Sequence, residues 1–219
     1  MAEHRYSVVV FDWDGTLFDS APGIASSIQE ASREMGLRVP DRATASHVIG
    51  LGLEDSLRHA VPDLPAPRYR DFVEIYRRHF LELEAEMRFF SGVPELLGEL
   101  TAGGRTLAVA TGKSRVGLER ALDASGLRSH FTATRCGDET RPKPHPAMLI
   151  ELIAELGADP HRVLMVGDTS HDLKMAHSAG VDSVAVAYGA HPVSVLRDHQ
   201  PRACVASVEE LREWLSRHG

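Results

Sequence analysis

The stretch Val8-Val9-Val10-Phe11-Asp12-Trp13-Asp14 begins with four apolar residues and ends in two carboxylates separated by one tryptophan. A short, continuous apolar run predicts a strand buried on both faces, as in a parallel sheet. Ligands of open α/β sheets bind beyond the carboxyl ends of the strands, which is where Asp12 and Asp14 stand. If the chain stays extended, both carboxylates lie on one side and repel each other unless a cation or a proton intervenes. Gly15, directly after them, lets the backbone turn close to a ligand.

Two simpler interpretations of this motif are weaker. A calcium-binding loop requires further acidic ligands and a terminal glutamate at fixed spacing, and the sequence lacks them. A bare acidic turn is the other alternative. It accounts neither for the apolar run in front of the acids nor for the polar groups that follow later strands.

Apolar runs of the same kind recur, and segments of helical periodicity separate them. The strong strand candidates are residues 107–110, 163–166 and 184–187, and the weaker ones are 131–136 and 203–206. Glycine follows the helical segments at positions 36, 103, 126, 157 and 180, as expected for left-handed C-terminal caps. This alternation predicts an α/β fold with a doubly wound, mainly parallel, Rossmann-like sheet.

Residues 20–90 interrupt the alternation, because they show helical periodicity and no convincing strand. We therefore predict two units: a Rossmann-like catalytic core formed by residues 1–19 and 91–219, and an inserted α-helical cap formed by residues 20–90. The stretches 17–18 and 91–92 would act as hinges, so that the cap closes over the site as a lid.

Composition limits the class of protein. The chain has 219 residues, of which 43% are hydrophobic and 25% charged, and its formal net charge is −7. This acidic balance disfavours nucleic acid and anionic membranes as partners. No apolar run reaches membrane-spanning length and residues 1–11 do not form a signal peptide, so we expect a cytoplasmic protein. Cys136 and Cys204 lack metal-type spacing and are expected to be reduced core residues, and the 12 histidines, without an HExxH pattern, to be solvated or hydrogen-bonded.

Polar residues also stand at or after later strands. Thr111 and Gly112, after 107–110, offer a hydroxyl and backbone N–H groups for phosphate oxygens, although Thr and Ser before a helix are more often N-caps. Lys143 stands between two prolines in the segment 141–146, a loop stiff enough to aim an ammonium group at a phosphate. As an isolated motif, a solvated surface lysine would be at least as common.

The run 163–166 is followed by Gly167-Asp168-Thr169-Ser170-His171-Asp172. Asp168 is a candidate metal ligand, and Asp172 is either a second ligand or a support for the first. The alternative is that Asp168 or Ser170 only caps the following helix, and capping and ligation can coexist. Because the carboxyl ends of parallel strands share one edge, these groups are expected to converge there. Carboxylate-only ligands favour a hard cation such as Mg²⁺.

In this order, Asp12-Trp13-Asp14-Gly15-Thr16, Thr111, Lys143 and Gly167-Asp168 with Asp172 resemble the four motifs of haloacid dehalogenase-type hydrolases, over about residues 8–188. The insert is similar to the helical cap of the subgroup that contains phosphoglycolate phosphatases and β-phosphoglucomutases. The segments 11–20, 91–97 and 141–146 are most similar to the phosphoglycolate phosphatase branch. One departure is Gly112, where many relatives carry asparagine.

The resemblance implies a phosphatase that hydrolyses a small-molecule phosphate monoester with Mg²⁺ through an aspartyl phosphate. The dehalogenases lack an acid at the position of Asp14, so its presence favours phosphate chemistry. The resemblance implies that Asp12 is the nucleophile and Asp14 the general acid and base. It implies that Thr111 and Lys143 bind and stabilise the phosphoryl group, with Gly15 and Gly112 beside it. It further implies that Asp12, the Asp14 backbone carbonyl and Asp168 hold Mg²⁺, with Asp172 in support.

Two other functions remain open on sequence alone. A phosphomutase of the β-phosphoglucomutase type would return the phosphoryl group to a sugar, but residues 50–53, expected to face the substrate, show no clear sugar-binding cluster. A non-enzymatic phospho-receiver module would need no cap and would carry its acceptor after a middle strand. Phosphoglycolate is the leading substrate by similarity, followed by sugar phosphates and nucleoside monophosphates.

Overall fold

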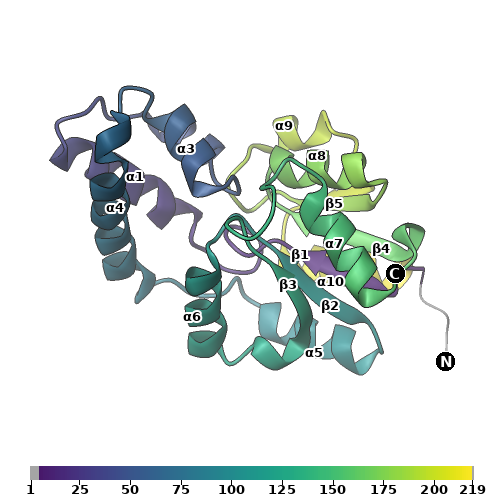
Figure 1. Cartoon of the computed structure of the whole chain (residues 1–219). Coiled ribbons are helices and arrows are strands. Elements are labelled where there is room, and N and C mark those ends of the chain that lie inside the picture. The colour runs from purple at the N-terminus through teal and green to yellow at the C-terminus, as the bar shows by residue number, and fades with distance from the viewer. Residues whose placement is uncertain (1–4, 219) are drawn as a thin grey trace.

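A computed structural model describes residues 5–218, and its centre is a six-stranded parallel sheet (Figure 1). The strand order is β3-β2-β1-β4-β5-β6, and every pair is parallel. The strands are β1 (Val8–Phe11), β2 (Thr106–Ala110), β3 (Phe131–Arg135), β4 (Val163–Gly167), β5 (Asp182–Val186) and β6 (Ala203–Val205). The predicted α/β fold is therefore confirmed, including the two weaker strands, with boundaries that differ from the predicted ones by at most two residues.

The sheet is buried on both faces, which explains its continuous apolar runs. In β1, Val9 and Phe11 pack into one hydrophobic cluster, while Val8 and Val10 pack into another on the opposite face. The same division separates Leu164 and Val166 from Val163 and Met165 in β4. Because successive side chains of a strand point to opposite faces, two apolar layers require an unbroken apolar run.

Helices from the intervening segments cover the two faces. Residues of α5, α6 and α10 line the first cluster, and residues of α7 and α8 line the second. The helices of this part are α5 (Val93–Ala102), α6 (Arg115–Ser125), α7 (Ala147–Leu156), α8 (Ser170–Ala179), α9 (Val193–Arg197) and α10 (Val208–His218), with short 3-10 turns at Arg128–His130 and Pro160–Arg162. Residues 1–4 and 219 of the predicted core lie outside the described residues.

One predicted helix cap is misplaced by a residue. Gly36, Gly126, Gly157 and Gly180 adopt the expected positive φ, but Gly103 is right-handed with φ −72°. Gly104, the next residue, takes the left-handed conformation with φ +83°. The chain thus reverses one residue later than the sequence pattern indicates.

Residues 20–90 form helices to one side of the sheet, in purple and blue in Figure 1. These are α1 (Ala21–Glu34), α2 (Arg42–His47), α3 (Leu53–Ala60), a 3-10 turn at Ala66–Arg68 and α4 (Tyr69–Glu84). They enclose their own hydrophobic cluster, with Ile28, Leu57 and Phe72 among its buried members. The two chain segments that lead in and out pair with each other, because Asp19 N donates to Arg88 O (2.9 Å) and Phe90 N to Leu17 O (3.1 Å). This segment is the predicted cap, and its movement as a lid stays a prediction.

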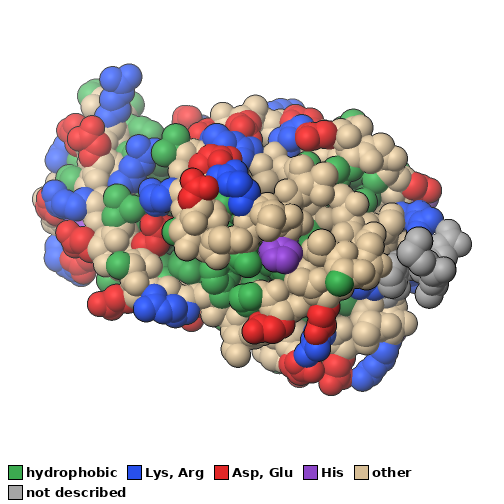
Figure 2. Space-filling model, turned by 90° about the horizontal axis from the view of Figure 1, so that it is seen from below, with side chains coloured by type: hydrophobic (Ala, Val, Ile, Leu, Met, Phe, Trp, Pro, Cys, Tyr) green, Lys and Arg blue, Asp and Glu red, His purple; other side chains and the backbone are tan. Residues whose placement is uncertain are grey.

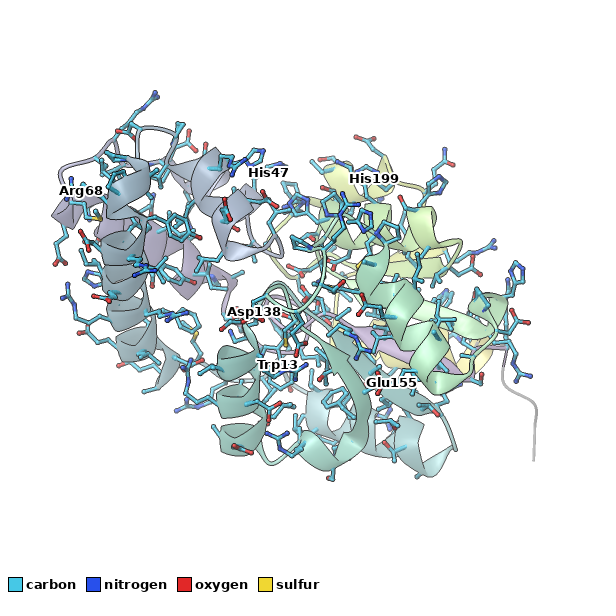
Figure 3. All side chains as sticks on the ribbon, viewed as in Figure 1. Trp13, His47, Arg68, Asp138, Glu155 and His199 are labelled. Carbon is cyan, nitrogen blue, oxygen red and sulfur yellow. The ribbon has the colours of Figure 1, made fainter. Side chains whose placement is uncertain are left out.

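Three histidines join the cap to the core where α2 ends, and Figure 3 labels one of them, His47. The backbone carbonyl of His47 meets Nε2 of His171 at 2.8 Å and Nε2 of His191 at 3.0 Å. Nδ1 of His191 accepts a hydrogen bond from the backbone N–H of Ser170 (3.1 Å), so this ring is neutral, with its proton on Nε2. The histidines are hydrogen-bonded, as the sequence predicts, but they also form a cluster that it does not indicate.

The surface carries charges of both signs in close alternation. On the face shown in Figure 2, acidic and basic side chains lie next to each other at both ends, and hydrophobic side chains gather near the middle. Ion pairs such as Arg120–Glu84 (2.9 Å) and Arg115–Glu139 (2.6 Å) account for part of this alternation. Among residues 5–218, no helix has both the length and the apolarity that crossing a membrane requires.

The two cysteines are predicted to differ in reactivity. Both are free thiols, but Cys136 is fully buried, and burial raises its pKa to about 12, whereas Cys204 is partly exposed. Because the thiolate is the reactive form, the native protein should react with Ellman's reagent at Cys204 alone and the denatured protein at both cysteines. Cys204→Ser should abolish the native reaction. Labelling of Cys136 at a comparable rate in the native protein would contradict its burial.

The histidine cluster predicts a loss of stability in acid. Burial lowers the pKa of His191 below its usual value of 6.5, and protonation of Nδ1 would break its hydrogen bond with Ser170. Below that pH the unfolded chain binds a proton that the folded one resists, so the free energy of unfolding should fall as the pH falls below about 6.5. Urea unfolding at pH 7.5 and 5.5 should show a smaller decrease for His191→Gln than for wild type. The exposed His161→Gln should keep the wild-type decrease, and an equal decrease in all three proteins would exclude this role.

Candidate active site

Asp12 follows the last residue of β1 and meets a lysine from the loop after β3. The side chain of Asp12 is almost fully buried, and its backbone N–H donates to the carbonyl of Val166 in β4 (2.9 Å). Nζ of Lys143 lies 2.8 Å from Oδ1 of Asp12 and 2.6 Å from Oδ1 of Asp172. Lys143 is itself 0% exposed, so the alternative of a solvated surface lysine is excluded.

The buried charges in this cluster do not balance. Asp12, Asp168 and Asp172 are all buried, and Lys143 is their buried cation. Burial and the neighbouring acids raise the pKa of Asp12 to about 7 against the attraction of Lys143, and the pKa of Asp168 rises well above its usual value for the same two reasons. Burial lowers the pKa of Lys143, but Asp12 and Asp172 raise it by more, so the ammonium group stays charged. Three carboxylates around one ammonium favour the binding of a further cation.

The residues fit a metal ion at this place. Asp12, Asp168 and Asp172 each offer an oxygen, and these oxygens all lie within 4.8 Å of one another. Oδ2 of Asp12 is buried without a hydrogen-bond donor among the described residues. Oxygen-only donors suit a hard divalent cation. Asp168 is oriented by Thr16 Oγ1, which donates to its Oδ1 (3.0 Å), and by the backbone N–H of Ala190, which donates to its Oδ2 (2.7 Å).

Asp172 has a second task that limits its freedom as a ligand. Its Oδ2 accepts hydrogen bonds from the backbone N–H (3.0 Å) and the hydroxyl (2.7 Å) of Thr169. Thr169 and Asp172 thus form a capping box at the start of α8, and the capping residue is Thr169 rather than Asp168 or Ser170. Because Lys143 binds its other oxygen, Asp172 is suited to hold Lys143 in position beside the acidic cluster.

Asp14 lies apart from this acidic cluster because the chain does not stay extended after Asp12. The backbone N–H groups of Leu17 and Phe18 donate to the carbonyl of Trp13, so the chain turns here. The carboxylate of Asp14 accepts hydrogen bonds from Ser20 Oγ (2.7 Å) and from Lys113 Nζ (2.8 and 3.0 Å to its two oxygens). The side chain of Asp14 therefore supplies no oxygen to the acidic cluster. The group of Asp14 that is expected to bind the metal is its backbone carbonyl.

The predicted phosphate-binding residues have different surroundings. Thr111 is buried at the end of β2, where its hydroxyl accepts a hydrogen bond from the backbone N–H of Lys113 (3.2 Å). Gly15 has φ +81°, and a Cβ there would come within 2.2 Å of Asp168 Oδ2, so its absent side chain makes room for the acid. Gly112 faces the cap, since a Cβ there would lie 2.4 Å from the carbonyl oxygen of Leu51. The departure from asparagine at this position thus coincides with a close approach of the cap backbone.

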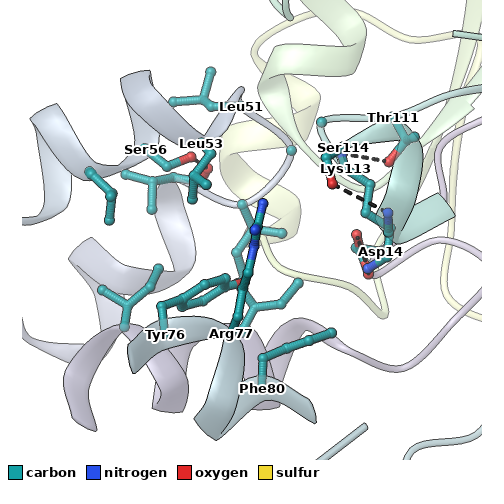
Figure 4. A pocket seen from close by; sticks show the side chains of 18 of the residues that line it. Asp14, Leu51, Leu53, Ser56, Tyr76, Arg77, Phe80, Thr111, Lys113 and Ser114 are labelled. Atoms are coloured by element: carbon teal, nitrogen blue, oxygen red, sulfur yellow. Dashed lines mark hydrogen bonds and ion pairs between the residues drawn. The ribbon is translucent and has the colours of Figure 1, made fainter. Parts of the chain in front are cut away.

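A cavity of about 220 Å³ connects these groups to the cap (Figure 4). Asp12, Asp14 and Thr111 line its core side, and residues of α1, α3 and α4 line the opposite side. In Figure 4, Arg77 points from α4 into the space between the cap and Ser114. The candidate nucleophile and the candidate acid therefore border the same cavity.

The comparisons with known proteins agree with this arrangement. The family model described as haloacid dehalogenase-like hydrolase matches residues 9–186. The chain belongs to this family. It is 36% identical over 210 residues to Probable phosphatase IndB of Dickeya dadantii (strain 3937), covering 93% of this chain and 91% of that protein.

Other relatives of this haloacid dehalogenase-like hydrolase cover almost the whole chain. The 5'-nucleotidase of Pseudomonas aeruginosa is 35% identical, with 98% of this chain and 97% of that protein covered. A solved structure from Haemophilus somnus, described as a predicted phosphoglycolate phosphatase, has a TM-score of 0.87 at 27% identity and covers 97% of this chain and 99% of that one. The predicted enzyme class, a phosphatase of this family, is confirmed. The names of these relatives point to different substrates.

Three groups near the site of this hydrolase are not indicated by the sequence. Lys113 follows the motif Thr111-Gly112, but nothing in the local pattern indicates that it reaches Asp14. Ser20, which donates to the same carboxylate, stands at the predicted domain boundary. Arg77 lies on an ordinary amphipathic helix, where an arginine predicts a solvated face.

Mg²⁺ is predicted to stabilise the folded protein through the acidic cluster. At about 100 times its Kd, a ligand adds about 2.7 kcal/mol, or roughly 5–10 °C in Tm for a chain of this size. Asp168→Asn should abolish this rise, and it should leave the metal-free protein at least as stable as wild type because one buried charge is removed.

Differential scanning fluorimetry with and without Mg²⁺ measures both effects. The exposed Asp198→Asn is the matched control and should keep the full rise in Tm. A full rise in the Asp168→Asn protein would place the metal elsewhere.

Proposed function

We propose that the protein hydrolyses a small-molecule phosphate monoester with Mg²⁺, through a phosphoryl group carried on Asp12. The observation that supports this most is the position of Asp12 at the floor of the cavity, with Lys143 at 2.8 Å from its Oδ1 and Asp168 within the same acidic cluster. A carboxylate nucleophile divides hydrolysis into two displacements. Family membership and the phosphatases among the relatives support the same reaction.

In the first displacement, a carboxylate oxygen of Asp12 attacks the phosphorus atom and the bond to the ester oxygen breaks. Asp14 gives its proton to the departing alkoxide, since an alkoxide leaves poorly without one. The hydroxyl of Thr111 binds a non-bridging phosphoryl oxygen. Lys143 offsets the charge that accumulates there, as preorganised cations do in phosphoryl transfer.

In the second displacement, Asp14, now ionised, takes a proton from a water molecule, and the water oxygen attacks the phosphorus atom. The bond between phosphorus and Asp12 breaks, which releases inorganic phosphate and restores both carboxyl groups. For this cycle Asp14 has to exchange its ion pair with Lys113 for a proton. Lys113 lines the cavity wall, so the phosphate of an entering substrate would compete with Asp14 for its ammonium group.

Mg²⁺ would be held by Asp12, Asp168 and the backbone carbonyl of Asp14, with Asp172 in support. It would neutralise charge on the phosphoryl oxygens and lower the repulsion between the substrate and the carboxylates. The three buried carboxylates with one buried lysine are the reason to expect it.

No observation favours the phosphomutase alternative. A mutase has to bind a sugar at two positions, and sugar hydroxyls require polar partners. The cap residues that line the cavity are mostly aliphatic or aromatic. Of residues 50–53, Gly50, Leu51 and Leu53 line it, and none has a polar side chain.

Variants of Asp12 and Asp14, the two acids of the first motif, are predicted to lose different steps of the reaction with p-nitrophenyl phosphate. A nitrophenolate leaves without a proton, so Asp14→Asn should still transfer a phosphoryl group to Asp12 and then stall, because no base activates the water. Asp12→Asn should form no adduct. Rapid acid quench followed by mass spectrometry of the peptide that contains residue 12 measures both.

The neighbouring Asp19, which is exposed, provides the matched control, and Asp19→Asn should turn over normally. An adduct that forms equally well without the Asp12 carboxylate would overturn the proposed nucleophile.

A further inference from the structure

The cap side of the cavity is apolar over most of its surface. Ile24 and Ile28 of α1, Leu53 and Leu57 of α3 and Phe80 of α4 line it. Phe80 lies against the core lysine that binds Asp14, with Lys113 Nζ 4.9 Å from its ring centroid. The part of a substrate that extends from the phosphate toward the cap therefore meets hydrocarbon.

The cap offers three polar side chains to this cavity, Ser56, Tyr76 and Arg77. Ser56 is already engaged, because its hydroxyl donates to the carbonyl of Val48 (3.0 Å). Burial raises the pKa of Tyr76, so its hydroxyl stays neutral and can donate a hydrogen bond. Its ring stacks on Phe80, with centroids 6.1 Å apart, and adds to the apolar wall.

Arg77 differs from the other cations that line the cavity. Lys113 pairs with Asp14 (2.8 Å) and Arg120 with Glu84 (2.9 Å), whereas Arg77 has no acidic partner within 4.0 Å among residues 5–218. In Figure 4 its guanidinium group lies in the open space of the pocket. The acids of the cavity lining are Asp12 and Asp14, and both are paired with lysines. Arg77 is exposed at the cavity, so its guanidinium group is available to bind an anionic group of a ligand.

We propose that the substrate is a phosphate monoester with an apolar, ring-sized alcohol portion that carries a carboxylate at its far end. This inference rests on the proposed function and specifies its substrate class. The phosphate would lie at Asp12, the apolar portion against α1, α3 and Phe80, and the carboxylate at Arg77, with the Tyr76 hydroxyl beside it. Arg77 is then a residue that determines specificity.

The other substrates suggested by similarity fit this wall less well. Phosphoglycolate has a two-carbon alcohol portion, so it would leave the apolar wall uncovered. A nucleoside monophosphate or a sugar phosphate would bring hydroxyl groups and ring nitrogens against Ile24, Leu53 and Phe80, where they would lose their hydrogen bonds to water without replacement.

A series of esters with similar leaving groups tests the apolar portion and the carboxylate separately. The series consists of methyl, benzyl, 4-carboxybenzyl and 4-carbamoylbenzyl phosphate, with phosphoglycolate and adenosine monophosphate for comparison. Burial of each methylene-sized group is worth about fourfold in binding, so kcat/KM should rise at least tenfold from methyl to benzyl phosphate. The carboxylate should exceed the isosteric carboxamide by about tenfold, mainly through KM, as expected for one hydrogen bond to a charged group.

Variants of two neighbouring arginines of α4 test whether Arg77 causes the preference for the carboxylate over the carboxamide. Arg77→Met should remove the preference for 4-carboxybenzyl over 4-carbamoylbenzyl phosphate, measured as the ratio of the two kcat/KM values. Arg78, the next residue, pairs with Glu34 and does not line the cavity, so Arg78→Met should keep the full preference. Direct binding of 4-carboxybenzyl phosphate to the Asp12→Asn protein, with and without the Arg77 change, should show the same tenfold difference without turnover.

The outcomes separate the two proposals. Hydrolysis of all esters at similar rates, or a higher kcat/KM for phosphoglycolate or adenosine monophosphate, would overturn the substrate class and leave the proposed function standing. A preference that survives in Arg77→Met would overturn the role of Arg77. If no ester is hydrolysed in the presence of Mg²⁺, the proposed function itself fails.

Discussion

The wholly buried ammonium group of Lys143 joins three separate parts of the chain. It lies 2.8 Å from Asp12 at the end of β1 and 2.6 Å from Asp172 in the first turn of α8, and it comes itself from the loop that follows β3. A buried lysine is costly unless it is paired, and so are buried carboxylates. Each partner therefore makes the burial of the others tolerable, and the loop, the strand end and the helix start are held in one arrangement.

The same charges explain why the site is suited to a phosphate and a metal. One ammonium group cannot neutralise three carboxylates, and Oδ2 of Asp12 has no donor among the described residues. Supporting contacts keep the acids in place: Thr16 and the backbone of Ala190 bind Asp168, and Thr169 binds Asp172. Such contacts fix the ligands before any ion or substrate arrives, which is the preorganisation that electrostatic catalysis requires.

Much of this architecture can be predicted from the sequence because its signals are local. Continuous apolar runs indicate strands buried on two faces, and the acids directly after β1 and β4 must meet at the same edge of a parallel sheet. What could not be predicted depends on contacts between distant segments. Nothing near Lys143 indicates that it is buried, nothing near Lys113 indicates its ion pair with Asp14, and the histidine cluster combines residues 47, 171 and 191. The capping residue of α8 was ambiguous because Asp168, Thr169 and Ser170 are all good caps, and only the backbone geometry selects Thr169.

The burial of Lys143 as the counter-charge of the acidic cluster is tested most directly by the stability of Lys143→Met. In urea unfolding without metal, this protein should lose about 3–5 kcal/mol relative to wild type, because the buried carboxylates lose their cation. The exposed Lys174→Met is the matched control and should change little. Mg²⁺ should restore part of the loss by supplying positive charge at the same place. A Lys143→Met protein as stable as wild type in the absence of metal, and no more responsive to Mg²⁺, would contradict this account.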